Sequence, residues 1–384
     1  MRLNIGVIFG GKSVEHEISI ISAIEAMGYA DENKYKIVPI YIDKDNTWYT
    51  GEHLKSIINF RDIDLVKRYA KKVALVKMDR SFVLQKLGMF KKNLCVIDIV
   101  VPIGHGAYLE DGSLQGYLNM LGVPYAGPSV LGAALGQDKV IQKELLSVNN
   151  IPVVNYTWFY NYELSDKKLV QERLSKLKFP VFIKPSSLGS SIGIEIAEDE
   201  KDFFKKVKNT IKYDKKILVE EKVNDVKEIN ISILGNYKKV EVSEIEEINS
   251  NEDFYSFKEK YVNNFSKTQE KDKKTKPIIS KEMIEDMKEY AINTFKALDG
   301  NGVARIDFLI NDKTKKIYIN EINTIPGSLS SYLWKAKKKN QTELFDDLIA
   351  IAVDNKKDDE QIQKAIPGNL LERFDNLKGT KLKK

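Results

Sequence analysis

Four side chains in the last third of the chain are of types that could hold a metal ion beside a cationic group. The stretches ARIDFLI and YINEIN alternate between polar and apolar residues, which predicts two β-strands joined by the polar turn 311–314. The alternation places Arg305 and Asp307 on one face of the first strand. If the strands pair, Asp307, Glu321 and Asn323 converge on one point with Arg305 beside them.

Three oxygen ligands without Cys or His suit a hard cation such as Mg²⁺, which keeps several waters and bridges substrate phosphates. In YINEIN the same period predicts Ile319 on the face of Glu321 and Asn323, and Ile322 on the opposite face. A half-polar hairpin facing solvent is an alternative that these residues alone leave open. The following residues 324–327, TIPG, favour a site because the N–H groups of a tight turn can line it.

Length and composition predict a soluble globular protein of two or three domains. The chain has 384 residues, of which 42% are hydrophobic and 30% charged. No apolar run approaches the roughly 18 residues of a membrane span, and MRLNIGVIFGG lacks the features of a secretory signal. The single cysteine, Cys95, excludes an internal disulfide framework and fits a reducing cytoplasm. Its apolar surroundings, LCVIDIVVPI, predict a buried structural thiol in one strand.

The net charge of +6 arises from 61 basic and 55 acidic residues that are interspersed. This balance is weak evidence for a nucleic-acid partner, and it also fits a site for anionic nucleotides. A basic stripe with aromatic side chains for base stacking is not evident. We therefore expect small-molecule partners rather than nucleic acid or a membrane.

The first third of the chain has the pattern of an open α/β sheet. LNIGVIFGG followed by KSVEHEISIISAIEAMGYA predicts a buried strand, a glycine turn and a helix with Glu15 at its start. A second strand with a hairpin-like end follows, and the lysine-rich residues 51–92 are expected to be irregular surface excursions. His105 comes directly after an apolar strand, where open α/β sheets bind ligands. A structural role for this histidine is the alternative.

The middle third predicts a helix over 130–151 with Lys139 near its middle. FPVFIKPSSLGSSIGIEIA then predicts a strand ending at Lys184, a loop of small residues and a second strand. Such a loop can close over phosphates, although a generic hairpin loop would look the same. Glu220 ends one apolar strand and Glu228 opens the next, so the two acids could reach different parts of one ligand. Exposed acids at strand ends are the alternative.

Residues 246–280 lack a sustained period but contain an aromatic and basic island, FYSFKEKY. A loop of this length in a compact enzyme is typically a lid or disordered, and the island favours a lid. An amphipathic helix ending near Gly300 is predicted next, followed by a helix at ELFDDLIAIAVDN. The charged tail beyond is expected to be loosely ordered.

Together these segments resemble the ATP-grasp superfamily and, within it, the D-alanine–D-alanine ligases. The matching segments, in the family's order, are GGKSVEHEIS, HGAYLEDGSLQG, PYAG with QDK downstream, KPSSLGSSIG, FYSFKEKY, and ARIDFLI with NEINTIPG. The resemblance covers roughly residues 1–335. It implies a three-domain α/β architecture: an N-terminal open parallel α/β domain (1–127), a central subdomain (128–223), a C-terminal subdomain (224–354) with the lid at about 246–280, and a charged tail (355–384).

The resemblance also implies a two-step reaction. ATP phosphorylates the carboxylate of one D-alanine, and the amine of a second attacks the acyl phosphate to give D-Ala-D-Ala, ADP and phosphate, a precursor for peptidoglycan. The positions matching the nucleotide-binding residues are Lys139, Lys184 and Lys260 for the phosphates, Glu220 for the adenine amino group and Glu228 for the ribose. Those matching the ligands of two Mg²⁺ ions, or of Mn²⁺, are Asp307, Glu321 and Asn323.

Five further positions match catalytic residues of the family. Arg305 and the N–H of Gly327 would stabilise the negative oxygen of the tetrahedral intermediate. Glu15 would hold the ammonium of the first substrate. Glu15, Ser190 and Tyr261 match a hydrogen-bonded trio that ties the lid to the other domains and keeps water from the acyl phosphate.

The sequence departs from the family pattern at three places. Leu109 stands where the family usually has Gly, and Tyr255-Ser256-Phe257 replaces a usual Tyr-Asp-Tyr. The segment 328–332, SLSSY, also differs from the usual aromatic-Thr-x-x-Ser, which ordinarily binds the acceptor carboxylate. His105 and Ser331 are the predicted substrate residues.

The resemblance leaves alternatives open on the acceptor and on activity. Tyr261 argues for an amine acceptor rather than D-lactate, because the depsipeptide-forming relatives carry His in the lid. One alternative is the same reaction with another acceptor, such as D-serine. The other is a protein that binds the nucleotide but has lost catalysis. Relatives are commonly homodimers, so a homodimer is expected here.

Overall fold

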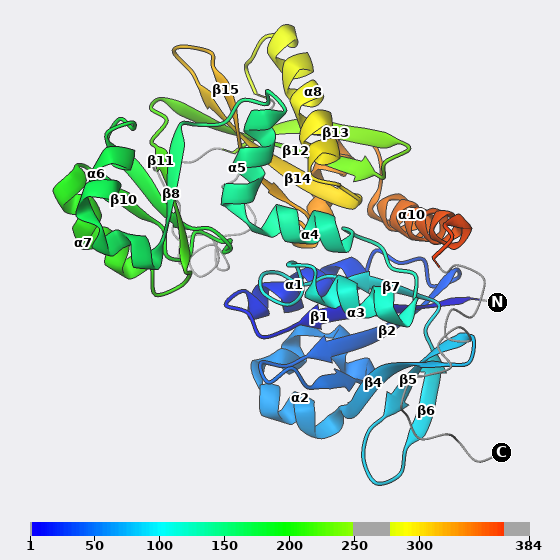
Figure 1. Cartoon of the computed structure of the whole chain (residues 1–384). Coiled ribbons are helices and arrows are strands. Elements are labelled where there is room, and N and C mark those ends of the chain that lie inside the picture. Colours follow the sequence, from blue (N-terminus) through cyan, green and yellow to red (C-terminus); the bar gives the residue numbers. More distant parts are fainter. Residues whose placement is uncertain (1, 249–276, 365–384) are drawn as a thin grey trace, which may run out of the picture.

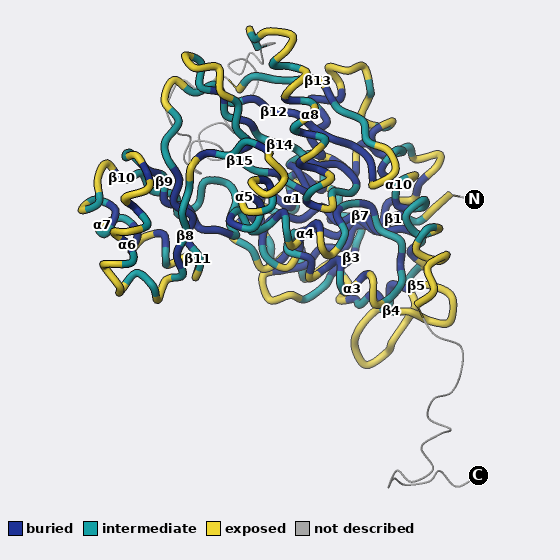
Figure 2. The backbone as a smooth tube through the Cα atoms, turned by 45° about the horizontal axis from the view of Figure 1, so that its top comes forward, coloured by how far each residue is buried: buried dark blue, intermediate teal, exposed yellow. Residues whose placement is uncertain are grey.

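The computed structural model describes residues 2–248 and 277–364, which form three β-sheets with helices packed against them (Figure 1). The mixed α/β fold predicted from the sequence is confirmed. The sheets follow one another along the chain, and Figure 2 shows that their strands carry most of the deeply buried backbone. No helix within the two described ranges is both long and apolar enough to cross a membrane.

The first sheet has seven strands in the order β6-β5-β4-β3-β2-β1-β7. β1 pairs in parallel with β2 and with β7, whereas the successive pairs from β2 to β6 are antiparallel. Glu15 and His105 therefore follow the carboxyl ends of two adjacent parallel strands, where open α/β sheets bind ligands. The strands are β1 (Leu3–Gly10), β2 (Tyr35–Ile42), β3 (Trp48–Thr50), β4 (Lys71–Met78), β5 (Ser81–Lys86), β6 (Lys92–Val96) and β7 (Ile99–Pro102).

Two predictions for this region are wrong. Residues 51–92 are not irregular, since they form η1 (Glu52–Lys55), η2 (Ile57–Arg61), α2 (Ile63–Tyr69) and the hairpin of β4 and β5. The alternating Val73 and Leu75, 2% and 0% exposed, anchor that hairpin in the core. The apolar run around Cys95 is not one strand either, because it divides into β6 and β7 on opposite edges of the sheet. Cys95 is accordingly only partly buried.

Helices α1 (His16–Met27) and α3 (Ser113–Leu121) belong to the same region. The buried face of α1 packs against β1 through Ile20 and Ala23. The same hydrophobic cluster contains Leu329 and Trp334 from near the other end of the chain. This shared core holds the start of α1, and with it Glu15, against the segment that follows the third sheet.

The second sheet is antiparallel, with the strand order β10-β9-β11-β8. Phe159, Ile183 and Phe203 belong to the core beneath it, where α6 and α7 pack. β9 carries Lys184, and its neighbour β11 carries Glu220. The elements are β8 (Tyr156–Tyr160), η3 (Asn161–Ser165), α6 (Lys167–Leu174), β9 (Val181–Pro185), β10 (Glu195–Ala197), α7 (Glu200–Thr210) and β11 (Lys216–Glu221).

The third sheet is also antiparallel, with the strand order β13-β12-β14-β15. Helix α8 covers one face through Met287, Ala291 and Phe295, and the opposite face carries the polar side chains. The last helix continues to Gln361, beyond the predicted end near residue 355. The elements are β12 (Val226–Gly235), β13 (Val240–Ile248), α8 (Lys281–Ala297), β14 (Gly302–Asn311), β15 (Ile317–Asn323), η6 (Gly327–Ser330), α9 (Ser331–Ala336) and α10 (Gln341–Gln361).

The helix predicted over 130–151 is two helices, α4 (Val130–Gln137) and α5 (Lys139–Val148). Asp138 between them has extended φ and ψ of −95° and 103°, and its carboxylate accepts from the N–H groups of Val140 and Ile141 at 3.0 and 3.2 Å. The residue is an N-cap, the role for which Asp is strongly preferred. Lys139 therefore lies in the first turn of α5 rather than in the middle of a helix.

We expect Asp138→Ala to destabilise the protein by about 2–4 kcal/mol. The substitution removes the cap of α5, typically worth about 1 kcal/mol, and also leaves the largely buried Lys216 without its carboxylate partner. The burial of Asp138 opposes a low pKa, but the hydrogen bond from Lys216 lowers the pKa below its usual value. The stability supplied by Asp138 is thus present above pH 4 or so and lost on further acidification. Urea denaturation measures the change.

Asp62→Ala is the matched control. Asp62 caps α2 in the same way, accepting from Leu65 N–H at 2.9 Å, but it is exposed and forms no ion pair with any of the residues that the structure describes. Its loss should cost only about 1 kcal/mol. Equal effects of the two substitutions would show that the Lys216 contact contributes nothing.

Candidate active site

The polar side chains predicted to converge lie on β14 and β15, which pair as expected. Asp307 lies opposite Glu321, and Arg305 lies opposite Asn323. On β14, residues 305, 307 and 309 are partly exposed while 306, 308 and 310 are buried, so the predicted alternation of this strand is confirmed.

A β-bulge interrupts the alternation of β15. Asp307 pairs with Glu321 but the next residue, Phe308, pairs with Ile319, so β15 has one extra residue at this point. Ile319 and Ile322 are therefore both buried, at 1% and 2% exposed, in the core under α8. The prediction that they face opposite ways is wrong because period-2 reasoning assumes an unbroken strand.

The charge of Asp307 is balanced by Arg305 on its own strand. Arg305 donates from Nε and Nη2 to the two carboxylate oxygens of Asp307 at 2.6 and 2.8 Å, and Asn323 Nδ2 donates to Asp307 at 3.1 Å. The described residues contain no group of three or more His, Cys, Asp or Glu side chains that could hold a metal ion. A metal at this point would therefore need Asn323 as a third ligand, an oxygen-only donor set of the kind Mg²⁺ prefers.

The charge of Glu321 is balanced by Lys139. The two side chains form an ion pair at 3.0 Å, and Lys139 also donates to the carbonyl of Leu188 at 2.8 Å. Burial alone would lower the pKa of Lys139, but the negative charge and hydrogen bond of Glu321, together with the charge of Glu15, outweigh burial and raise it. Lys139 is thus a permanent cation beside the acids of β15.

Lys184 and Glu220, predicted for opposite ends of the nucleotide, contact each other directly. Glu220 is 2% exposed and pairs with both Lys184 and Lys143, the latter at 2.9 Å. Burial favours the neutral acid, yet the two lysines lower the pKa of Glu220 to about 2. Its carboxylate can reach an adenine amino group only by exchanging one of these partners. Glu221, the next residue, borders the same cavity.

A cavity of about 580 Å³ lies between the second and third sheets. Its walls contain most of the side chains predicted for ATP, metal and catalysis. Those present are Lys139, Lys184, Ser190, Glu220, Glu228, Arg305, Asp307 and Glu321. Lys260 and Tyr261 lie outside the described residues.

The loop after β9 brings the second sheet to the first. Ser190 donates a hydrogen bond to Glu15 at the start of α1, across 175 residues of sequence. Ser190 and Ser191 have φ of 54° and 59°, in the left-handed region that residues other than glycine seldom adopt. A Cβ on Gly189 would lie 3.0 Å from Glu15, so the absence of a side chain allows this close approach.

His105 is buried in the loop after β7. Its backbone N–H donates to Ser19 Oγ at 2.8 Å, and its ring Nε2 lies 3.0 Å from Ser22 Oγ. Burial and the nearby positive charge of Arg305 lower the pKa of His105 to about 4. The imidazole is therefore neutral at physiological pH, so it can bind substrate as a hydrogen-bonding group but not as a cation.

The segment after β15 has an unusual backbone. Gly327 opens η6, and Ser328, Leu329 and Ser330 have φ of 50°, 55° and 50° in succession. Ser331, predicted to bind the acceptor carboxylate, is 5% exposed. Its hydroxyl lies 3.1 Å from the hydroxyl of Tyr29, which follows α1.

Glu110 is a site residue that the sequence reasoning missed. Its carboxylate accepts from Gly106 N–H at 3.1 Å, in the His105 loop, and from Ile325 N–H at 3.3 Å, in the turn after β15. Burial, and then the charge of Glu15, raise the pKa of Glu110 to about 8. Glu110 lies within the segment HGAYLEDG that matches the family. An acidic residue between glycines in this loop could have indicated a site residue from the sequence.

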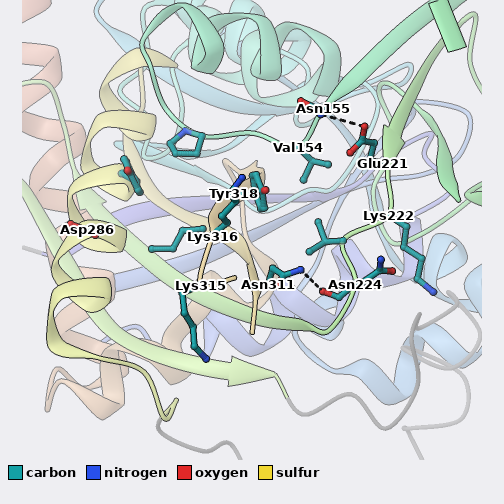
Figure 3. A pocket seen from close by; sticks show the side chains of 14 residues that line it. Val154, Asn155, Glu221, Lys222, Asn224, Asp286, Asn311, Lys315, Lys316 and Tyr318 are labelled. Atoms are coloured by element: carbon teal, nitrogen blue, oxygen red, sulfur yellow. Dashed lines mark hydrogen bonds between the residues drawn. The ribbon is translucent and has the colours of Figure 1, made fainter. Parts of the chain in front are cut away.

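A second cavity, of about 620 Å³, shares the wall 221–224 with the first (Figure 3). Glu221 accepts there from Asn155 at 3.3 Å, and Asn311 donates to the carbonyl of Asn224 at 2.9 Å. Figure 3 shows the charged ends of Lys222 and Lys315 extending away from each other. These groups do not converge on one point, unlike those of the first cavity.

Comparison with known proteins identifies the class. The fold matches solved structures of ATP-grasp enzymes: a D-alanine–D-alanine ligase from Coxiella burnetii superimposes with a TM-score of 0.80, at 30% identity over 94% of this chain and 96% of that one. The VanG D-Ala:D-Ser ligase from Enterococcus faecalis gives a TM-score of 0.76, at 27% identity over 92% and 100%.

Sequence comparison then identifies the family. Family models described as the D-ala D-ala ligase N-terminus and C-terminus match residues 4–128 and 145–354. A D-alanine–D-alanine ligase from Thermosipho melanesiensis is 40% identical over 93% of this chain and 95% of its own. The chain belongs to the D-alanine–D-alanine ligase family.

We expect Glu110→Gln to change how stability depends on pH. Below pH 4.5 or so the carboxyl is protonated in both the folded and the unfolded protein, and above about pH 8 it is ionised in both. Between these values the folded protein holds a proton that the unfolded chain has released, so raising the pH lowers the free energy of unfolding. Glutamine does not titrate and should remove this decline. Denaturation midpoints from pH 5 to 8 measure it.

Glu172→Gln, at a side chain 68% exposed, is the control and should follow the wild-type curve. Parallel pH curves for Glu110→Gln and wild type would contradict the raised pKa.

Proposed function

We propose that the protein joins two D-alanines to D-Ala-D-Ala at the expense of ATP, supplying a precursor of peptidoglycan. The observation that carries the proposal is the cavity in which Lys139, Arg305, Asp307 and Glu321 meet, in a chain whose family is that of the D-alanine–D-alanine ligases. The γ-phosphoryl group would pass to the carboxylate of the first D-alanine. The amine of the second would then attack the acyl carbon and displace phosphate.

Phosphoryl transfer depends on positioning and charge neutralisation. Lys139 and Lys184, on the cavity wall, would neutralise the phosphates, joined by Lys260 of the lid motif. Glu220 and Glu228 lie on the wall that we assign to the adenine and ribose. The ion pair of Lys184 with Glu220 would hold the lysine in place before the nucleotide arrives.

Asp307, Glu321 and Asn323 would hold two Mg²⁺ ions, for which Mn²⁺ could substitute. Such ions, when bound, neutralise charge on the β- and γ-phosphates. The fit rests on oxygen donors from facing positions of β14 and β15, with no thiol or imidazole among them. Arg305 and Lys139 pair with these carboxylates in the structure, so bound metal ions would replace the two bases at the carboxylates and leave the bases to contact phosphate.

Groups around Arg305 would assist the attack on the acyl carbon. Arg305 and the Gly327 N–H would stabilise the oxyanion of the tetrahedral intermediate, as preorganised donors do. Glu15, held by Ser190, would bind the first ammonium, and Tyr261 would complete the trio that excludes water. His105, neutral and buried beside Arg305, would contact the first substrate.

The remaining assignments are part of the same proposal. We place the enzyme in the cytoplasm as a homodimer. We divide the chain into domains at 1–127, 128–223 and 224–354, with a tail from 355.

A D-serine acceptor is the second candidate, since the VanG D-Ala:D-Ser ligase has a similar structure. The identity of 40% to a relative named D-alanine–D-alanine ligase favours D-alanine. The third candidate is a protein that binds ATP without turnover. The facing positions of Asp307 and Glu321 argue against this candidate, because they bring together two of the proposed metal ligands.

Incubation with ATP, Mg²⁺ and a panel of D-amino acids tests the proposal. We expect D-Ala-D-Ala as the main product by mass, with one phosphate released per dipeptide and none above background with L-alanine. A predominant D-Ala-D-Ser product would establish the second candidate. ATP binding without any dipeptide would refute the ligase activity.

Glu321→Gln should lower kcat by about 100-fold or more while leaving the fold intact, because a neutral amide is a poor partner for both a divalent cation and Lys139. Steady-state phosphate release and circular dichroism measure the two effects. Glu244→Gln, at an exposed residue of β13 in the same sheet, is the control and should retain full activity. Full activity of Glu321→Gln would remove Glu321 from the metal site.

A further inference from the structure

The outer strands of the first sheet carry an excess of positive charge. Residues 71–97, which include β4, β5 and β6, contain seven basic residues and one acidic residue. Their net charge of +6 equals that of the whole chain, so the rest of the chain is neutral overall. The expectation of no membrane partner rested on the charge of the whole chain, which conceals this local excess. The basic residues are Lys71, Lys72, Lys77, Arg80, Lys86, Lys91 and Lys92.

These basic side chains lack acidic partners in the parts of the chain that the structure describes, since none of the seven forms an ion pair there. Two of them face each other, because the strand register places Lys86 of β5 directly opposite Lys92 of β6. Like charges at opposed positions of paired strands are destabilising. An anionic partner would relieve this repulsion.

Most of the charge lies at one end of the three strands. Because β4 and β5 are antiparallel, the start of β4 lies beside the end of β5, where Leu87 N–H donates to the carbonyl of Lys72 at 2.8 Å. The one acid, Asp79, lies in the turn at the opposite end. The strands project from the edge of the first sheet, away from the second and third sheets (Figure 1). The lysines at the projecting end are Lys71, Lys72, Lys86, Lys91 and Lys92.

The loop that joins β5 to β6 at this end has an apolar tip. Met89 is 91% exposed, Phe90 80% and Leu87 42%. Adjacent large apolar side chains that protrude from a charged surface mark an interaction site. Lysines at a sheet edge protect it from pairing with another chain, but this protection does not account for Met89 and Phe90. The tip therefore indicates a partner that is apolar inside and anionic at its surface.

We propose that the hairpin tip, residues 86–92, docks on a lipid bilayer with anionic headgroups. Met89 and Phe90 enter the boundary between headgroups and acyl chains, and the lysines contact the headgroups around them. Lysine suits this position because its stem covers apolar surface while its ammonium stays in the polar layer. The cavity lies between the other two sheets, so docking leaves it open to small molecules. The inference does not depend on the proposed ligase function.

Two other partners fit the same surface less well. A second copy of the chain in a symmetric dimer would bring the same lysines against each other. Single-stranded nucleic acid would satisfy the lysines, but it binds through several aromatic side chains on which bases stack. The tip offers one aromatic ring, Phe90, beside aliphatic side chains. A bilayer accommodates both the charge and the apolar tip.

Sedimentation with lipid vesicles tests the inference on the full chain. Vesicles of phosphatidylcholine alone are compared with vesicles of phosphatidylcholine mixed with phosphatidylglycerol. We expect binding to the anionic vesicles only, and weaker binding as salt increases, because salt screens the lysines. Absence of binding to the anionic vesicles at low salt would overturn the inference.

Lys91→Gln combined with Lys92→Gln tests the contribution of charge. We expect the partition coefficient onto anionic vesicles to fall by about 10- to 30-fold, since each basic residue at such a surface contributes roughly fivefold. The matched control is Lys205→Gln with Lys208→Gln, which changes the net charge equally at two exposed residues of α7. Equal losses from the two double variants would show that only net charge matters, which contradicts docking through the tip.

Met89→Ser combined with Phe90→Ser tests the apolar contact at unchanged charge. Binding to anionic vesicles should fall by about 10-fold or more, because little apolar area remains to enter the bilayer. Met120→Ser, at a residue of α3 that is 91% exposed, is the control and should bind like the wild type. Unchanged binding of the tip variant would reject the inference. So would a change from dimer to monomer on sedimentation, since the tip would then lie between two copies.

Phe90→Trp reports insertion directly. After subtraction of the wild-type spectrum, the added indole emission should move to shorter wavelength with anionic vesicles, and lipids brominated on their acyl chains should quench it. Emission that stays constant while the vesicles bind the protein would place the tip outside the bilayer and refute the inference. Circular dichroism of every variant should match the wild type, because all the substituted residues are exposed.

Discussion

The pairing of β14 with β15, including its bulge, is the constraint on which the site depends. A regular strand would send Ile322 to the polar face, or Glu321 into the core, because alternate residues must face opposite ways. The extra residue keeps Ile319 and Ile322 both under α8 while Glu321 and Asn323 remain beside Asp307. One inserted residue thus reconciles a closed hydrophobic core with three ligand-type side chains on one side of the sheet.

Several carboxylates in a partly buried site are unfavourable unless each pairs with a cationic side chain. In most cases here the cationic side chain lies on a different helix or strand from the carboxylate. Asp307 is paired within its strand, by Arg305, but Glu321 is paired by Lys139 of α5 and Glu220 by Lys143 and Lys184. These contacts join the second sheet, α5 and the third sheet. The same charges that would bind a nucleotide therefore also hold the elements around the cavity in register.

Sequence patterns predicted the features that depend on local alternation and failed where distant contacts decide. The faces of β14 follow from period 2 and are confirmed. The bulge in β15 and the break at Asp138 were missed, because the first depends on the partner strand and the second on the contact of Asp138 with Lys216. Composition also concealed the hairpin of β4 and β5, whose many lysines mask the few apolar residues that are buried: Val73, Leu75, Val83 and Leu84. The roles assigned to the site residues remain predictions.

The least regular part of the chain lies where the substrates would meet. Three successive residues, 328–330, have left-handed φ, which costs energy for non-glycine residues and persists only where surrounding contacts enforce it. Those contacts come from both sides: Glu25 of α1 and Tyr29 just beyond the end of α1 contact Ser328 and Ser331, and Asn230 and Ser232 of β12 contact Tyr332 and Trp334. The backbone is therefore held between the first and third sheets. This placement explains why adjacent residues of one short helix, Ser331 and Tyr332, belong to different neighbourhoods, a distinction that similarity of residue type alone could not make.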